Sequence, residues 1–163
     1  MEITIREMKK TDWEAVSQIY NEGIETKTAT FQQDVPCYDE WNREHMKPCR
    51  FVAVTAEENI VGWAALTPVS SRCVYQGVAE VSVYVTPYAQ GDGIGKGLLT
   101  KLIESSEQRD IWTLQASIIS SNTASVRLHE RCGFRLIGYR EKIAKDMDGI
   151  WQDIVLFEHR SQQ

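Results

Sequence analysis

A strand that leads through a glycine-rich loop into a helix, between residues 80 and 103, is the feature of the sequence that most restricts the fold. Residues 81–85 are β-branched or aromatic at most positions, which predicts a strand that ends before Pro87. The loop that follows, residues 90–97, contains four glycines. Residues 94–103 then carry leucine or isoleucine every three to four positions, which predicts a helix with one apolar face.

This loop predicts a binding site for a phosphate or pyrophosphate. The first amides of a helix have no intrahelical partner, and the helix dipole adds partial positive charge there. Gly91, Gly93 and Gly95 have no Cβ atom to hold a ligand away from the backbone. The dinucleotide pattern G-x-G-x-x-G fails, because its third glycine falls on Lys96 or Leu98. The Walker pattern fails as well, because its second glycine falls on Lys96. The pattern that fits is Gln-x-x-Gly-x-Gly, beginning at Gln90; an ordinary glycine-rich turn is the alternative.

A second motif, NTASVRLHERCGF, occupies residues 122–134. Asn122 is a typical helix N-cap and Ser125 lies in the first turn, so capping alone explains these two residues. Capping does not explain why the helix ends in Gly133 and Phe134 after the polar His129.

The rest of the chain alternates between strand-like and helix-like segments, without a repeat or linker. Thr11 and Glu14 fit a capping box that opens a helix with Ile19 on its inner face. The other predicted elements are strands 2–8, 51–55, 60–66, 110–119, 134–145 and 150–158, and a short helix from 39 to 46. The order β-α-α-β-β-β-α-β-α-β-β predicts one mixed α/β sheet.

The composition argues against several classes of protein. A net charge of −5 makes a nucleic-acid or anionic-membrane surface unfavourable, although Arg127, Arg131 and Arg135 could still meet a phosphate-bearing cofactor. No apolar run approaches the roughly 20 residues of a membrane span, and the N-terminus is charged, unlike a signal peptide. The four cysteines form no C-x-x-C pair, which favours reduced thiols in a cytoplasmic protein over a metal or disulfide role.

The two motifs, in this order and with a predicted strand between them, resemble the GNAT superfamily of N-acetyltransferases, in which the glycine loop binds the pyrophosphate of coenzyme A. In that superfamily the second helix reads Asn-x-x-(Ser/Ala)-x-x-Leu-Tyr-x-x-x-Gly-Phe. Within it, the chain is most similar to phosphinothricin and methionine sulfone or sulfoximine acetyltransferases. The segments that carry this similarity are Ile19-Tyr20-Asn21, Thr30-Phe31, residues 80–85, Leu128-His129-Glu130 and residues 149–153.

The resemblance implies a single GNAT domain over residues 1–163, with a mixed, mostly antiparallel sheet flanked by helices. It implies acetyl-CoA as cosubstrate, a small-molecule amine as acceptor, no metal, and a homodimer. The residues expected to bind acetyl-CoA are Val83, Tyr84, Val85, Gln90, Gly91, Asp92, Gly93, Ile94, Gly95, Lys96, Asn122 and Ser125.

One departure from the family pattern concerns the acceptor. The family usually has an arginine four residues before the glutamate of the strand, where this chain has Gln76. A guanidinium that would bind a substrate carboxylate through two hydrogen bonds is therefore missing at that position. Arg72 is a possible substitute, and Tyr75, Gln76 and Phe31 are the candidate acceptor-binding residues.

Acetyl transfer to an amine needs a base for the amine, a donor for the oxyanion and a proton for the thiolate. Glu80 is the candidate base, because a carboxylate at the start of a buried strand is desolvated; the alternative is a solvent-facing edge residue. His129 stands where the superfamily often has a tyrosine that protonates the thiolate, or else makes a structural hydrogen bond. Amides of residues 81–85 are the candidate oxyanion donors, whereas Cys132 is interpreted as structural.

The sequence thus predicts direct N-acetyl transfer, within a ternary complex, to the α-amino group of a small amino-acid-like molecule. Two alternatives stay open: a different amine, such as a peptide N-terminus or a polyamine, and a non-catalytic sensor of acyl-CoA.

Overall fold

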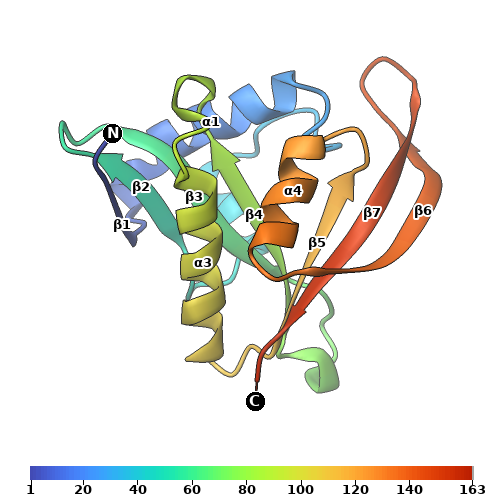
Figure 1. Ribbon diagram of the computed structural model, residues 1–163. Helices are drawn as coiled ribbons and strands as arrows, with labels where there is room; N and C mark the ends of the chain where they lie inside the picture. The colour runs from blue at the N-terminus through green and yellow to red at the C-terminus, as the bar shows by residue number, and fades with distance from the viewer. Residues whose placement is uncertain (163) are drawn as a thin grey trace.

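The computed structural model describes residues 1–162, in which seven strands form one sheet of order β1-β2-β3-β4-β5-β7-β6 (Figure 1). Gln163, the last residue of the predicted domain, lies outside the described residues. The strands are β1 Ile3–Glu7, β2 Phe51–Thr55, β3 Ile60–Pro68, β4 Val78–Val85, β5 Thr113–Ile119, β6 Arg135–Lys145 and β7 Trp151–Arg160. The helices are α1 Trp13–Glu25, α2 Tyr38–Glu44, α3 Ile94–Glu107 and α4 Thr123–Arg131, with 3-10 turns η1 Lys10–Asp12, η2 Cys73–Tyr75 and η3 Pro87–Ala89. The predicted order of strands and helices is confirmed.

The sheet opens at its centre, between β4 and β5. These neighbouring strands are parallel, and they pair at only three positions: Val78 with Thr113, Ala79 with Leu114, and Glu80 with Gln115. Beyond Glu80, β4 runs on along β3 while β5 runs on along β7, and the two strands diverge (Figure 1). All other strand pairs are antiparallel. One strand edge of residues 81–85 is therefore left without a partner strand.

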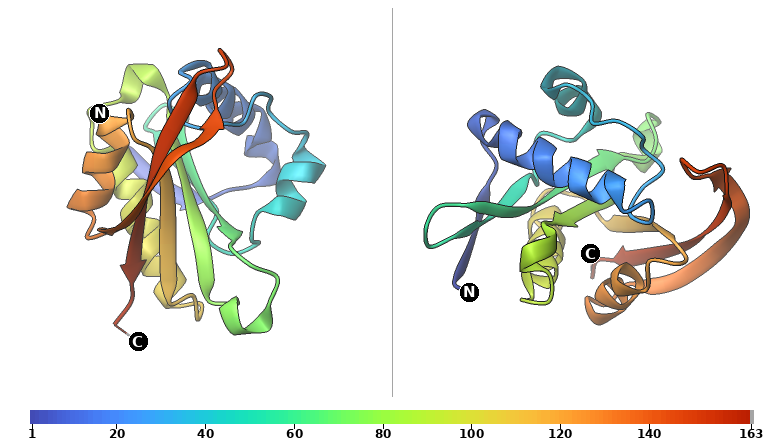
Figure 2. Two further views of the ribbon diagram at one scale, coloured as in Figure 1. Left: turned by 90° about the vertical axis from the view of Figure 1, so that its right-hand side faces the viewer. Right: turned by 90° about the horizontal axis from the view of Figure 1, so that it is seen from above.

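Helices cover both faces of the sheet, with α1 and α2 on one side and α3 and α4 on the other (Figure 2). Under α3, the leucines at positions 98, 99 and 102 are fully buried against β3 and β4. Under α1, the core is aromatic, with Trp41 and Trp63 fully buried. Each such large apolar side chain stabilises the fold by roughly 1.5–3 kcal/mol through burial.

The start of α1 differs from the predicted Thr11–Glu14 capping box. Asp12 is the N-cap, and its carboxylate accepts a hydrogen bond from the Lys9 amide at 2.7 Å. The same carboxylate binds both terminal nitrogens of Arg6, at 2.8 and 3.0 Å. By accepting from the Lys9 amide, Asp12 closes the turn η1, which contains Thr11. The helix α1 therefore begins after this turn, at Trp13.

Two other elements depart slightly from the prediction. Strand β5 begins at Thr113 and not at Asp110, because Asp110 has a left-handed φ of 59° that cannot continue a strand. Residues 69–76, predicted as a plain loop, contain the turn η2. The predicted end of α4 at Gly133, with a φ of 87°, is confirmed.

Candidate active site

Two cavities meet where β4 and β5 part. The larger has a volume of about 650 Å³ and lies between the glycine loop and α4. The smaller, of about 420 Å³, lies between the loop after α1 and the β6–β7 hairpin. Both are lined by Ala29, Val83, Tyr84 and Ser125, so they share a wall at the unpaired stretch of β4. The two cavities are therefore adjacent along this stretch of β4.

The glycine loop forms one side of the larger cavity. Gly91 and Gly93 have φ values of 89° and 78°, which other residues rarely adopt, and Gly93 is the N-cap of α3. The first intrahelical bond of α3 runs from the Gly97 amide to the Gly93 carbonyl at 3.0 Å. The amides of residues 94–96 precede that bond and have no intrahelical acceptor, which is the arrangement that binds a pyrophosphate. An added Cβ at either glycine meets no protein atom within 4 Å, so the space above the loop is open to a ligand.

Most of the residues predicted to bind a cofactor line this cavity. They are Val83, Tyr84, Val85, Gln90, Gly91, Gly93, Ile94, Gly95, Lys96, Asn122 and Ser125. Asp92 is exposed and is not among the lining residues. Asn122 caps α4, since its side-chain oxygen accepts from the Ser125 amide at 3.2 Å.

Three basic side chains supply positive charge at the larger cavity: Lys96 on α3 and Arg127 and Arg131 on α4. The two arginines stand four residues apart on α4, so both guanidinium groups extend from the same face of the helix. Arg135, the third arginine of the sequence cluster, lies on β6 in an ion pair with Glu158 instead. The residues present therefore fit a long anionic cofactor with a pyrophosphate at the helix N-terminus.

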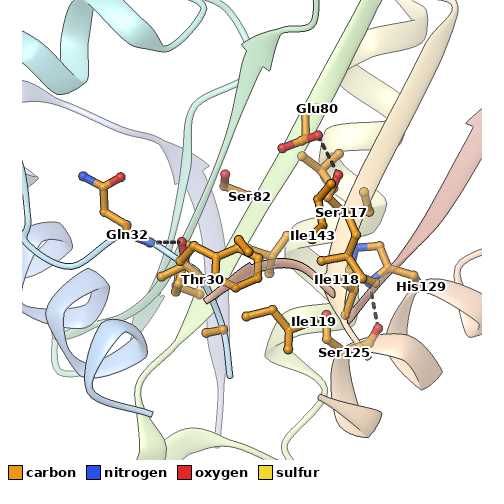
Figure 3. A pocket seen from close by; sticks show the side chains of 18 residues that line it. Thr30, Gln32, Glu80, Ser82, Ser117, Ile118, Ile119, Ser125, His129 and Ile143 are labelled. Carbon is orange, nitrogen blue, oxygen red and sulfur yellow. Dashed lines mark hydrogen bonds between the residues drawn. The ribbon is translucent and has the colours of Figure 1, made fainter. Parts of the chain in front are cut away.

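The smaller cavity contains mixed apolar and neutral polar side chains around one carboxylate (Figure 3). Its polar side chains are Thr30, Gln32, Glu80, Ser82, Tyr84, Ser117, Ser125 and His129. Sequence reasoning missed Ser82, although it stands two residues after Glu80 and so shares its face of the strand. It also missed Ser117, because the register of β5 against β4 cannot be read from sequence.

Glu80 occupies the last paired position of β4 and β5. Its Oε1 atom accepts a hydrogen bond from Gln115 Nε2 at 2.9 Å and another from Ser117 Oγ at 3.1 Å. Oε2 has no hydrogen-bond partner among residues 1–162. The carboxylate is thus fixed in orientation, while one oxygen remains free to accept a proton in the cavity (Figure 3).

His129 is buried on α4, with 5% of its surface exposed. Its Nδ1 atom lies 2.7 Å from the Ser125 carbonyl, which can only accept, so Nδ1 carries the proton. Nε2 is buried and has no partner among the described residues. Desolvation lowers the pKa of this imidazole below its usual value, although the Ser125 carbonyl partly opposes the shift. His129 is therefore neutral at physiological pH, with its lone pair directed away from water.

The three residues predicted to bind the acceptor lie in different places. Phe31 lines the smaller cavity. Tyr75 and Gln76 are exposed in the turn η2 and the residue after it, before β4 begins, and they are not among the lining residues. Arg72 stacks on the Tyr75 ring with 5.7 Å between guanidinium carbon and ring centroid, so it also lies in that turn.

The cysteines form neither a disulfide nor part of a metal cluster in the part of the chain that the structure describes. All four cysteines are free, and burial raises the pKa of the Cys132 and Cys49 thiols. Within residues 1–162, no three potential metal ligands lie together. None of the helices in that range has the length and apolarity to cross a bilayer.

Comparisons with known proteins agree with this geometry. Residues 13–134 match the Acetyltransferase (GNAT) family. The chain is 30% identical to a phosphinothricin N-acetyltransferase of Streptomyces coelicolor, over 96% of this chain and 95% of the relative. It is 31% identical to an L-methionine sulfoximine/L-methionine sulfone acetyltransferase of Salmonella typhimurium, over 96% and 93%.

A solved structure extends the agreement to three dimensions. The yncA protein of Salmonella typhimurium, solved with its cofactor acetyl-CoA, superposes with a TM-score of 0.91 at 27% identity, covering 100% of this chain and 96% of that one. The fold, the geometry of the glycine loop and the matching family model lead to one conclusion. The chain belongs to the GNAT acetyltransferase family and is an acetyl-CoA-dependent N-acetyltransferase.

Proposed function

We propose that the protein transfers the acetyl group of acetyl-CoA to the α-amino group of a small amino-acid-like acceptor, of the phosphinothricin, methionine sulfone or methionine sulfoximine type. The observation that carries this proposal is the position of Glu80, at the point where the strands part and on the wall of the smaller cavity. The larger cavity then holds the donor and the smaller one the acceptor. The names of the two curated relatives support the class of acceptor.

Direct attack within a ternary complex fits this arrangement. When bound, acetyl-CoA supplies a thioester carbonyl that an amine can attack. Glu80 takes the proton from the acceptor ammonium, directly or through a water, because a protonated amine has no lone pair. The unpaired strand edge of residues 81–85 offers backbone amides to the acetyl oxygen as it gains charge. Ser125, which lines both cavities, helps to position the two reactants.

We assign His129 a structural role in place of proton donation to the thiolate; the leaving sulfur would then take its proton from Glu80, which has received one from the amine, or from water. Its proton lies on Nδ1 and is engaged by the Ser125 carbonyl, while Nε2 is buried and unprotonated. Proton donation from Nε2 would need a second proton on an imidazole whose pKa burial has lowered. The hydrogen bond instead fixes the first turn of α4, including Ser125.

A thiol-release assay across acceptors tests the proposal. The expected result is CoA release with L-methionine sulfone, L-methionine sulfoximine or phosphinothricin, and none with spermidine. Isothermal titration with acetyl-CoA gives the control for a folded donor site. Tight binding of acetyl-CoA without turnover of any amine would favour the sensor alternative.

A second class of acceptor is favoured by the charges of the smaller cavity. Its lining residues among positions 1–162 include one carboxylate, Glu80, and no arginine or lysine. An α-carboxylate on the acceptor would lie within a few ångströms of Glu80 without a compensating cation, which is unfavourable. Amino-acid amides and peptide N-termini avoid that repulsion. A comparison of kcat/KM for L-methionine sulfone with that for its amide decides between the two classes.

We also propose a homodimer that works in the cytoplasm. Strand β6 is an edge strand, and the β6–β7 hairpin exposes large apolar side chains, which a second copy of the chain would cover. Those that do not line the smaller cavity are Leu136, Ile137, Tyr139, Met147, Ile150 and Trp151. A reducing compartment suits the four free cysteines. Sedimentation equilibrium of the protein and of a Leu136→Glu variant tests the dimer, because a buried charge there would yield monomers.

A further inference from the structure

The wall of the acceptor cavity is completed by an irregular segment of β6. Strands β6 and β7 pair directly on both sides of it, Arg140 with Ile154 and Ala144 with Gln152, and a second register shift lies further back, between Leu136 and Gly138. Between these pairs, three residues of β6 (141–143) stand opposite a single residue of β7, Asp153. The extra residues form a bulge, which bends a strand and redirects its side chains.

The bulge carries Ile143 into the acceptor cavity. Ile143 and Ala144 are the residues of β6 that line it, and Ile143 is drawn among the cavity side chains together with Ser117 and Ile118 (Figure 3). Every other residue of β6 is absent from that lining. Because Ile143 and Ala144 are consecutive and both line the cavity, the regular alternation of the strand is broken here, and Ile143 lies within the bulge.

One carboxylate, that of Asp153, holds the bulge. Asp153 Oδ1 accepts a hydrogen bond from the Lys142 amide at 2.7 Å, and Oδ2 accepts one from the Tyr139 hydroxyl. Lys142 has a left-handed φ of 46°, a conformation that a lysine adopts only when its surroundings enforce it. These hydrogen bonds also lower the pKa of Asp153, that with Tyr139 most, so the carboxylate is ionised at neutral pH.

The backbone of Asp153 links this wall to the donor side of the site. Its carbonyl accepts a hydrogen bond from the Ser120 amide at 3.0 Å. Ser120 lies between the end of β5 and Asn122, the cap of α4, which lines the donor cavity. Asp153 thereby fixes the acceptor wall relative to the helix that lines both cavities.

We propose that Ile143 selects acceptors by the size of their side chain, and that Asp153 is the positioning residue that holds the β6 bulge and Ile143 in place. The proposal rests on the proposed function, because it assigns the smaller cavity to the acceptor. Ile143 contributes an apolar wall that meets the acceptor side chain beyond the α-carbon. The bulge sets the depth of the cavity at that wall.

The test compares matched variants on acceptors that differ in side-chain size. L-2-aminobutyrate, L-methionine sulfone and L-phenylalanine are each supplied as free acid and as amide, so that the carboxyl and the side chain vary independently. Ile143→Ala should raise kcat/KM for phenylalanine relative to 2-aminobutyrate by about tenfold, the discrimination that one or two methylenes in an apolar pocket provide. Ile137→Ala is the control: Ile137 lies on the same strand with nearly the same exposure, 43% against 44%, and is not a lining residue. It should leave the ratio unchanged.

Asp153 is tested through the same ratio. Asp153→Ala should shift selectivity in the same direction as Ile143→Ala and raise the acceptor KM, without a change in acetyl-CoA affinity. Asp153→Asn keeps an oxygen for the Lys142 amide and should restore most of the selectivity. Tyr139→Phe removes one of the two hydrogen bonds and should have a smaller effect than Asp153→Ala. If Asp153→Ala does not fold, the graded effects of Asp153→Asn and Tyr139→Phe carry the test.

The outcomes separate this inference from the proposed function. Turnover with equal acceptor profiles for Ile143→Ala and Ile137→Ala would overturn the inference and leave the proposed function intact. A lowered acetyl-CoA affinity in the Asp153 variants, with unchanged selectivity, would overturn the positioning role. Absence of turnover of every acceptor by the unaltered protein would overturn both.

Discussion

Replacement of Glu80 by glutamine is the sharpest test of the chemistry. Glutamine has nearly the same shape, and its side-chain oxygen can still accept the hydrogen bonds from Gln115 and Ser117 at 2.9 and 3.1 Å. What the variant loses is the ability of the free oxygen to accept a proton. Glu80 is not among the residues that line the donor cavity, so binding of acetyl-CoA should not change.

The size of the effect follows from the role of the group. A positioned general base contributes about 10²–10⁴ to the rate, which corresponds to roughly 2.7–5.4 kcal/mol of transition-state stabilisation at about 1.36 kcal/mol for each factor of ten. The loss of stability should be smaller, about 1 kcal/mol or less, because the hydrogen bonds to Oε1 are kept in neutral form. Catalysis and stability therefore separate in this variant.

The assay measures kcat by thiol release and the acetyl-CoA dissociation constant by calorimetry. Glu158→Gln is the matched control, because Glu158 lies on β7 opposite Gln115 and outside the lining of both cavities. We expect Glu80→Gln to lose at least about a hundredfold in kcat with unaltered donor affinity, and Glu158→Gln to lose little. A kcat for Glu80→Gln within a factor of about two of the unaltered enzyme would refute the assignment.

Three further predictions concern the donor loop, the core and pH. Gly93→Ala should weaken acetyl-CoA binding, since an alanine at a φ of 78° costs about 1–2 kcal/mol at the N-cap of α3. Gly149→Ala is the control: its φ of 76° in the hairpin turn should strain the backbone similarly, while the acetyl-CoA affinity measured by calorimetry stays unchanged. Leu98→Ala should lower the free energy of unfolding in urea by about 2–5 kcal/mol, because Leu98 is fully buried, and a loss under about 1 kcal/mol would contradict the packing described. Burial lowers the pKa of both His45 and His129, so the unfolded state takes up protons first as pH falls below about 6.5. The free energy of unfolding should then decline by at most about 1.4 kcal/mol per histidine and pH unit. Equal urea midpoints at about pH 7.5 and 5.5 would contradict this linkage.

The glycine loop and the order of elements were predictable because both depend on local rules. Gly93 marks the N-cap of α3, and Gly133 marks the end of α4, each through a φ that side chains disfavour. Asn122 was likewise identified as a cap from its type and position. In these cases the residue type and its neighbours in sequence determine where the helix begins or ends.

The smaller cavity could be predicted only in part, because it depends on contacts between distant segments. The register that brings Gln115 and Ser117 to Glu80 arises from parallel pairing of strands separated by a whole helix. The bulge that brings in Ile143 has no sequence signal such as a glycine, since a lysine occupies its left-handed position. A nearby contact also escaped prediction, since Asp12, the N-cap of α1 in place of Thr11, binds Arg6 on β1.

The short pairing between β4 and β5 has a consequence for how the ligand-free protein behaves. Only three residue pairs join the two halves of the sheet directly, so the amide groups of acetyl-CoA's pantetheine arm can act as a surrogate strand in the gap. Hydrogen–deuterium exchange in residues 81–85 should then slow when the cosubstrate is added, more than in the fully paired β2. At a hundredfold excess over the dissociation constant, ligation would add about 2.7 kcal/mol to the resistance against unfolding. The free energy of unfolding would thereby rise with the concentration of acetyl-CoA around the enzyme.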